Sequence, residues 1–142
     1  MLKFVHSYFA YLVTALLVIS TTRFLVRYAL SKDYTPTDFR LALITFISSH
    51  TQLLIGLLLY FVSDKFLLWN EYSFNDIVSI DSARFYLIYH PIVNIIAIAF
   101  ITRGYSLHKK RRVSNLKFKA IGFHYLLGLV LILFSIPSSF WI

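Results

Sequence analysis

Four long stretches of the sequence are almost entirely apolar, and shorter polar segments separate them. A helix needs roughly 20 residues to cross a hydrocarbon core about 30 Å thick, and each stretch is close to that length. The pattern predicts an all-α integral membrane protein with four transmembrane helices in an up-down-up-down bundle, as one domain over residues 1–142. The predicted spans are residues 4–26, 41–62, 85–102 and 120–140.

The first stretch follows Lys3 and could be read as a signal peptide. It is too long for one and lacks a small-residue cleavage site, so we expect it to be a helix of the mature protein. The composition, with 58% hydrophobic and 14% charged residues, agrees with a membrane protein. The chain has no cysteine, which excludes disulfides, thiolate metal sites and cysteine nucleophiles. A bound metal must therefore be held by histidine or oxygen.

The net charge of +8 is distributed unevenly along the chain. Eleven of the fourteen Lys and Arg residues lie on the side of the bundle that the first and third connections reach. Short cytoplasmic loops concentrate such residues, so we expect these connections to be cytoplasmic and both termini to lie outside. The basic run 109–112 is then an orientation signal that also attracts anionic lipids. We expect no nucleic-acid partner, because no recognition fold accompanies the charge.

Two connections differ in character. The second, residues 63–84, mixes aromatic and acidic residues, which predicts an amphipathic lid along the outer interface that could cap the bundle. The third, residues 103–119, is basic, and its His108 is predicted to be solvated.

Each predicted span contains one histidine, namely His6, His50, His90 and His124. Ionisable side chains are costly in hydrocarbon, so those that occur face the bundle interior and mark sites. Four such histidines suggest a cofactor.

Depth divides these histidines into two pairs. His6 and His90 lie about 3 Å and about 7–8 Å from the outer boundary, at about 1.5 Å of rise per residue. Helices one and three are diagonal in such a bundle, so a haem could lie between them with an imidazole on each side of the iron. His50 and His124 lie about 13–14 Å and about 6 Å from the inner boundary, a looser match that makes an inner haem the second option.

Other polar residues complete the predicted haem site. Lys3 and Arg84 lie at the outer mouth and are predicted to pair with haem propionates. Asn94, four residues after His90, is predicted to orient a propionate or a water molecule.

Each histidine also has an alternative interpretation. His6 could be wetted at the interface, and His90 could bond a carbonyl freed near Pro91. His50 and His124 could join helices through ordinary hydrogen bonds, as polar side chains do in lipid.

Several segments resemble a family of small bacterial four-helix membrane proteins labelled cytochrome b-like, and the resemblance covers nearly the whole chain. The spacing of Gln52 and Gly56, with a histidine early in the next helix, also resembles half of the haem A synthase fold. That second resemblance implies His6 and His90 as haem ligands with Gln52 and Gly56 between them, whereas His50 fits the first family better. The segments that carry the resemblance are 6–7, 49–56, 84–104 and 135–137.

The interpretation is a b-type cytochrome of the bacterial inner membrane that binds one haem b, or two, and transfers single electrons. A membrane quinone or a larger respiratory complex is the expected partner. The alternative is a cofactor-free accessory or assembly subunit of a larger membrane complex. A third reading, a haem-modifying enzyme, is disfavoured because the chain has only one four-helix unit and no obvious acidic residue beside an outer histidine.

Overall fold

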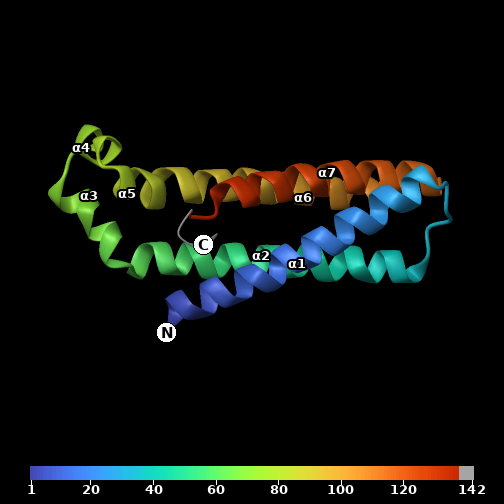
Figure 1. Ribbon diagram of the computed structural model, residues 1–142, viewed down its shortest axis with the longest axis horizontal. Coiled ribbons are helices and arrows are strands. Elements are labelled where there is room, and N and C mark those ends of the chain that lie inside the picture. Colours follow the sequence, from blue (N-terminus) through green and yellow to red (C-terminus); the bar gives the residue numbers. More distant parts are fainter. Residues whose placement is uncertain (138–142) are drawn as a thin grey trace.

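The computed structural model describes residues 1–137, which form an all-α bundle (Figure 1). Four helical segments of this described part are long and apolar enough to cross a membrane. They are α1 (Leu2–Ala29), α2 (Pro36–Val62), the continuous segment Asp81–Lys110, and α7 (Ser114–Ser135). The third segment comprises α5 (Asp81–Arg84), the π-helical turn η2 (Phe85–Tyr89) and α6 (His90–Lys110). The predicted fold class is confirmed, and the chain is a multi-pass helical membrane protein.

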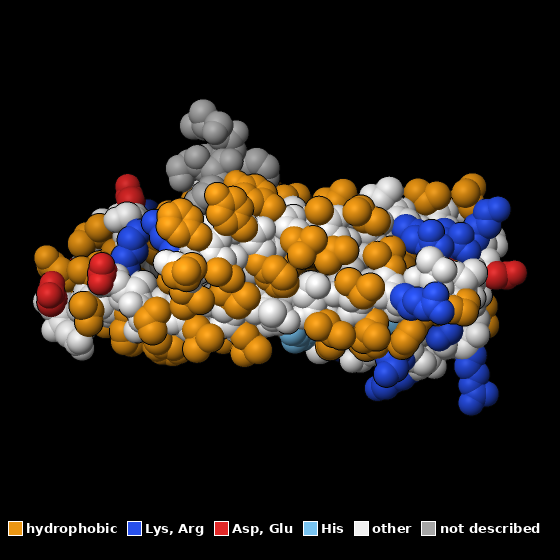
Figure 2. Space-filling view, turned by 90° about the horizontal axis from the view of Figure 1, so that it is seen from below, with side chains coloured by type: hydrophobic (Ala, Val, Ile, Leu, Met, Phe, Trp, Pro, Cys, Tyr) orange, Lys and Arg blue, Asp and Glu red, His pale blue; other side chains and the backbone are white. Residues whose placement is uncertain are grey.

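The outer surface of the bundle is apolar along most of its length (Figure 2). Large apolar side chains point outward from all four long helices, for example Leu12, Leu54, Ile95 and Leu127 with 50%, 63%, 47% and 47% of their surface exposed. Soluble proteins rarely show so much contiguous apolar surface. The bundle is therefore built to contact lipid.

The helices follow the predicted antiparallel order. α1 contacts α2 and α7, and α6 contacts the same two helices. α1 and α6 are therefore diagonal partners, as are α2 and α7. In Figure 1, α1 runs obliquely across α2.

One end of the bundle, which we call the basic end, holds the connections 30–35 and 111–113. Lys and Arg side chains gather there in Figure 2. Thr35 and Asp38 form a capping box and Pro36 occupies the first turn, so α2 begins ahead of the predicted span 41–62. The buried Asp38 carboxylate accepts a hydrogen bond from Nε of Arg23 at 2.7 Å and lies 3.3 Å from Nε of Arg27. This ion cluster joins α1 to α2.

The helices extend beyond the predicted spans at the basic end. α6 continues to Lys110 and α7 begins at Ser114, so most of the predicted polar connection 103–119 is helical. The charged residues of this segment lower its hydropathy, so it was predicted to be a connection. They do not interrupt the backbone hydrogen bonds, so the segment is helical. α7 ends at Ser135, and the predicted end of the fourth span at residue 140 lies outside the described residues.

The prediction that His108 is solvated was wrong. Its side chain is fully buried on α6, and Nε2 lies 2.8 Å from the hydroxyl of Tyr34. The ring also packs near those of Tyr34 and Tyr105. His108 continues the buried face of α6 instead of belonging to a loop.

The opposite end carries the lid, defined as residues 63–84. It contains η1 (Asp64–Leu67), α3 (Leu68–Glu71), α4 (Phe74–Ser79) and α5. A separate small core of Ile77, Ala83 and Leu87 holds it together. The lid continues from the end of α2 and leads into η2, beyond the points where α1 begins and α7 ends (Figure 1).

Candidate functional site

The structure brings together His6 on α1 and His90 on the diagonal helix α6. The ring centres are 6.2 Å apart and the ring planes make an angle of 79°. Both side chains are half-buried. Among the described residues, this is the one pair of histidine rings in contact, and it is the pair that depth and diagonal geometry predicted.

α2 holds His6 from one side through Gln52 and Gly56. The amide nitrogen of Gln52 donates to the backbone carbonyl of His6 at 2.9 Å and lies 3.2 Å from Nδ1 of the ring. A Cβ atom at Gly56 would stand only 3.0 Å from Cε1 of His6. The absence of a side chain at Gly56 therefore makes room for the imidazole. Gln52 Oε1 is buried and has no hydrogen-bond partner within the described part of the chain.

The end of α7 holds His90. Nδ1 of His90 lies 2.8 Å from the carbonyl oxygen of Ser135, so Nδ1 carries the proton and donates. The carbonyl is free to accept because α7 ends at this residue. Nε2 is then the unprotonated nitrogen, which is the form of imidazole that binds metals.

Asn94 reinforces this arrangement. Its amide nitrogen donates to the carbonyl of His90 at 2.7 Å and to the hydroxyl of Ser135 at 2.9 Å. Asn94 thus links the histidine turn to the end of α7. Its predicted contact with a propionate or a water molecule stays a prediction.

The turn before His90 is irregular, and the lid contacts it. In a regular helix the N–H of residue 91 would bond the carbonyl of residue 87, but Pro91 has no N–H. Instead the hydroxyl of Tyr60 donates to the carbonyl of Leu87 at 3.0 Å, and Nε1 of Trp69 donates to that hydroxyl at 3.0 Å. We call Trp69, Tyr60 and the Leu87 carbonyl the latch, since it ties the lid to the segment that carries His90.

The second predicted pair is not brought together. Nδ1 of His50 lies 2.7 Å from the carbonyl of Phe46, and Nε2 lies 2.9 Å from the hydroxyl of Thr102. Nδ1 of His124 lies 2.7 Å from the carbonyl of Ala120. Both nitrogens of His50 are thus engaged by protein groups, as expected of a side chain that joins helices. An inner haem remains a prediction that these contacts do not favour.

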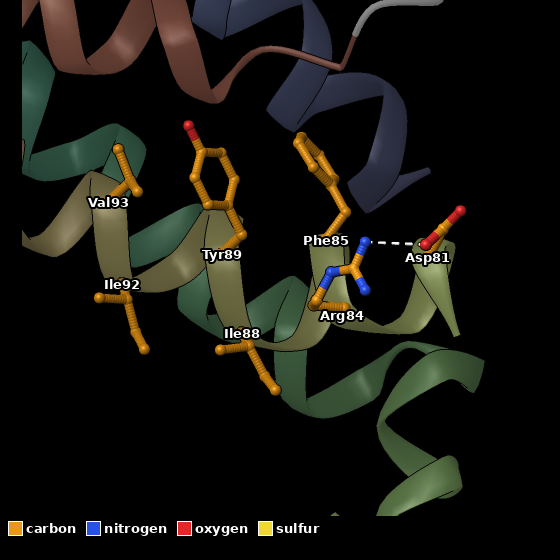
Figure 3. A pocket seen from close by; sticks show the side chains of 7 residues that line it. All are labelled: Asp81, Arg84, Phe85, Ile88, Tyr89, Ile92 and Val93. Atoms are coloured by element: carbon orange, nitrogen blue, oxygen red, sulfur yellow. Dashed lines mark hydrogen bonds and ion pairs between the residues drawn. The ribbon is translucent and has the colours of Figure 1, made fainter. Parts of the chain in front are cut away.

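Arg84 is occupied within the lid. Its guanidinium donates to Asp81 at 2.8 Å and to the carbonyl of Val78 at 2.8 Å. With Asp81 it lines one end of an open groove of about 620 Å³, as Figure 3 shows. Phe85, Ile88, Tyr89, Ile92 and Val93 form the rest of its wall. The Arg84 charge is largely compensated before any ligand binds.

The basic end contains a polar cluster that the sequence pattern did not indicate. The Tyr34 hydroxyl bonds His108, and the Tyr34 backbone N–H donates to Ser114 at 2.9 Å. Lys117 donates to the carbonyl of His108 at 3.0 Å. Burial raises the pKa of Tyr34, so its hydroxyl stays protonated. These bonds tie α6 and α7 to the first connection.

The His6–His90 pair offers only two metal ligands. No group of three or more His, Cys, Asp or Glu side chains that could hold a metal ion occurs in residues 1–137. A bare ion such as zinc usually takes four ligands in proteins. The pair therefore suits a metal complex that brings its own remaining ligands.

Comparison with known proteins identifies no relative: no family model, no curated protein and no solved structure matches the chain.

Proposed function

We propose that this protein is a membrane b-type cytochrome that binds haem b between His6 and His90 and transfers single electrons. The observation that carries the proposal is the contact of these two imidazoles across the bundle diagonal, at 6.2 Å between ring centres.

The spacing suits two axial ligands. Bonds from metals to imidazole nitrogen are about 2 Å long, so ligand nitrogens on opposite sides of one metal are about 4 Å apart and the ring centres about 6–6.5 Å. The observed 6.2 Å lies in this range, and the 79° angle between the planes is compatible with rings turned about a common axis.

The surroundings of both rings also suit the group. Ser135 keeps the proton of His90 on Nδ1 and leaves Nε2 for the metal. Ligation by Nε2 of His6 would place the proton on Nδ1, which lies 3.2 Å from the amide nitrogen of Gln52. The Gln52 amide would then turn to present Oε1, a buried acceptor without a partner within the described residues, and would give up its bond to the His6 carbonyl. Gly56 provides room for the His6 ring.

A haem bound here would supply a one-electron redox couple. The protein would hold the haem in place and shield it from dioxygen and water. His6 and His90 would both bind the iron and so leave it no free position for dioxygen. Apolar side chains around the pair would keep water away and influence the potential. A membrane quinone or a larger respiratory complex would exchange the electrons. The proposed location is the bacterial inner membrane, with both termini on the outer side.

The decisive measurement is a reduced-minus-oxidised visible spectrum of the protein purified in detergent from haem-replete cells. We expect a sharp α band and a shifted Soret band, and one haem per chain. His6→Ala and His90→Ala should abolish both bands, whereas the matched variants His50→Ala and His124→Ala should retain them.

Two outcomes would contradict the proposal. A spectrum without haem bands would favour the cofactor-free accessory subunit, in which the histidines only join helices. Haem retained in both the His6 and the His90 variants would transfer the site to His50 and His124.

A further inference from the structure

Two lysines lie near the His6–His90 pair, on its lid side. Lys3 precedes His6 by three residues and so lies on the same face of α1, one turn nearer the end of the helix. Lys65 in η1 places its ammonium nitrogen 3.4 Å from the centre of the Tyr86 ring. Tyr86 precedes His90 by four residues, about one turn nearer the lid. Lys3 therefore lies about one turn from His6, and Lys65 contacts a residue about one turn from His90, in both cases on the side of the lid.

The charge of Lys3 acts on Lys65, and neither ammonium group is compensated within the described residues. Burial, and then the charge of Lys3, lower the pKa of Lys65. In residues 1–137 neither ammonium group has a carboxylate within ion-pair distance, whereas Arg84 in the same part of the molecule is paired with Asp81. Like charges held together in this way repel one another, and an anion placed between them relieves the repulsion.

The position of the lysines indicates which anion they would hold. Haem b carries two carboxylates on one edge. Lys3 and Lys65 supply two ammonium groups at one edge of the proposed haem site, so each could pair with one carboxylate. The Tyr86 ring keeps Lys65 in place through a cation–π contact.

We propose that Lys3 and Lys65 form a two-lysine carboxylate site that holds both propionates of the haem bound between His6 and His90. This inference rests on the proposed function. It replaces Arg84 by Lys65 as the partner of Lys3, and it makes the lid part of the cofactor site, since an anion held by both lysines connects α1 to η1.

The test is a hemin titration of full-length protein expressed without haem, in a nonionic detergent that supplies no anion. The Lys3→Gln/Lys65→Gln double variant is expected to bind hemin about tenfold more weakly than the wild type. Hemin dimethyl ester, which lacks the carboxylate charges, is expected to bind both proteins equally. Arg84→Gln and Lys119→Gln are matched controls and should stay within about twofold of the wild type. Lys65→Arg keeps the charge and should retain most of the affinity.

Each outcome has one meaning. Equal hemin affinity of wild type and double variant would overturn the carboxylate site and leave the haem proposal intact. Equal losses for hemin and its ester would show that the lysines act on the fold instead of on the carboxylates, and would also overturn it. Failure of the wild type to bind either compound would refute the proposed function, and the inference with it.

Discussion

At the scale of single residues, the neighbours of His6 and His90 determine where each imidazole lies and which of its nitrogens carries the proton. Gly56 lies against the His6 ring, and the Ser135 carbonyl accepts the Nδ1 proton of His90. Neither neighbour has chemistry of its own at a metal site. Each acts by limiting where an imidazole can be and which nitrogen bears its proton.

Gly56→Ala is expected to weaken haem binding without unfolding the protein. The added Cβ would stand 3.0 Å from Cε1 of His6, so the ring must move, and overpacking of this kind costs about 1–3 kcal/mol. A hemin titration measures the loss, and circular dichroism checks the helix content. Thr51→Ala, at an exposed position of the same helix, is the control. Unchanged affinity in Gly56→Ala would show that His6 does not need its present position.

Asn94→Leu should destabilise the link between α6 and the end of α7. The variant removes the side-chain bonds to the His90 carbonyl and to the Ser135 hydroxyl, and a bond of this kind contributes about 0.5–1.5 kcal/mol. Thermal unfolding in detergent measures the change. If Asn94 served only a bound propionate, the protein without haem would be as stable as the wild type.

The residues of the pair could be predicted from the sequence, but their partners could not. One histidine per span and the rise of a helix suffice to place His6 and His90 at similar depth. The Ser135 carbonyl becomes an acceptor only because α7 ends there, and no residue type indicates that a backbone carbonyl will face a ring on another helix. His108 was misplaced because the charges around it interrupt the hydropathy, although Ile101, Gly104 and Tyr105 already continue a buried face toward it.

At the scale of elements, two sets of bonds fix the ends of the bundle: the latch at the lid end and the ion cluster at the basic end. The latch satisfies a carbonyl that Pro91 cannot bond, and through Trp69 it includes the lid. The ion cluster fixes α1 to the first turn of α2 through Asp38. Both rest on contacts between residues distant in sequence, which is why the amphipathic lid was predicted but its attachment was not.

Tyr60→Phe should loosen the lid while leaving the long helices in place. The variant keeps the ring but leaves the Leu87 carbonyl and the Trp69 N–H unpaired, at a cost of about 1–3 kcal/mol. Hydrogen exchange should become faster in residues 63–84 and stay unchanged at the basic end. Tyr72→Phe, an exposed tyrosine of the lid, is the control. Equal exchange in both variants would show that the latch does not hold the lid.

Asp38→Asn should lower the stability of the whole bundle. It removes the charge that Arg23 and Arg27 share, and breaking a buried pair costs up to about 3–5 kcal/mol. Because the two arginine side chains remain 35% and 21% exposed, solvent screening reduces the expected loss to about 2 kcal/mol. Thermal unfolding of wild type, Asp38→Asn and Asp33→Asn gives the comparison, with Asp33 as the exposed neighbour.

At the scale of the whole molecule, the two ends differ in charge and in construction. The basic end holds short connections and most of the lysines and arginines, while the lid occupies the other end (Figure 2). The order of the helices and their diagonal pairing followed from four apolar stretches with short connections. The lengths of the helices beyond the apolar stretches could not be predicted in this way. Hydropathy indicates which residues contact lipid, but it does not indicate where the backbone hydrogen bonds of a helix end.

The proposed orientation can be tested directly because the chain has no cysteine. Tyr72→Cys in the lid should react with a membrane-impermeant maleimide in spheroplasts, and Lys110→Cys at the basic end should react only after the membrane is opened. Labelling measured by a gel shift gives the result. The reverse pattern would place both termini on the cytoplasmic side and overturn the proposed sidedness.

The unequal attachment of α1 along its length has a consequence for assembly. Its basic half is tied to α2 by the Ser20–Thr45 bond and by Arg23 on Asp38, whereas its first turns have one such tie, from Gln52 to the His6 carbonyl. Local opening costs least where ties are few. The first turns of α1 are therefore the part of the bundle that opens most easily while the other helices stay assembled. The proposed haem would then enter a newly inserted chain late, between its amino-terminal turns and α2.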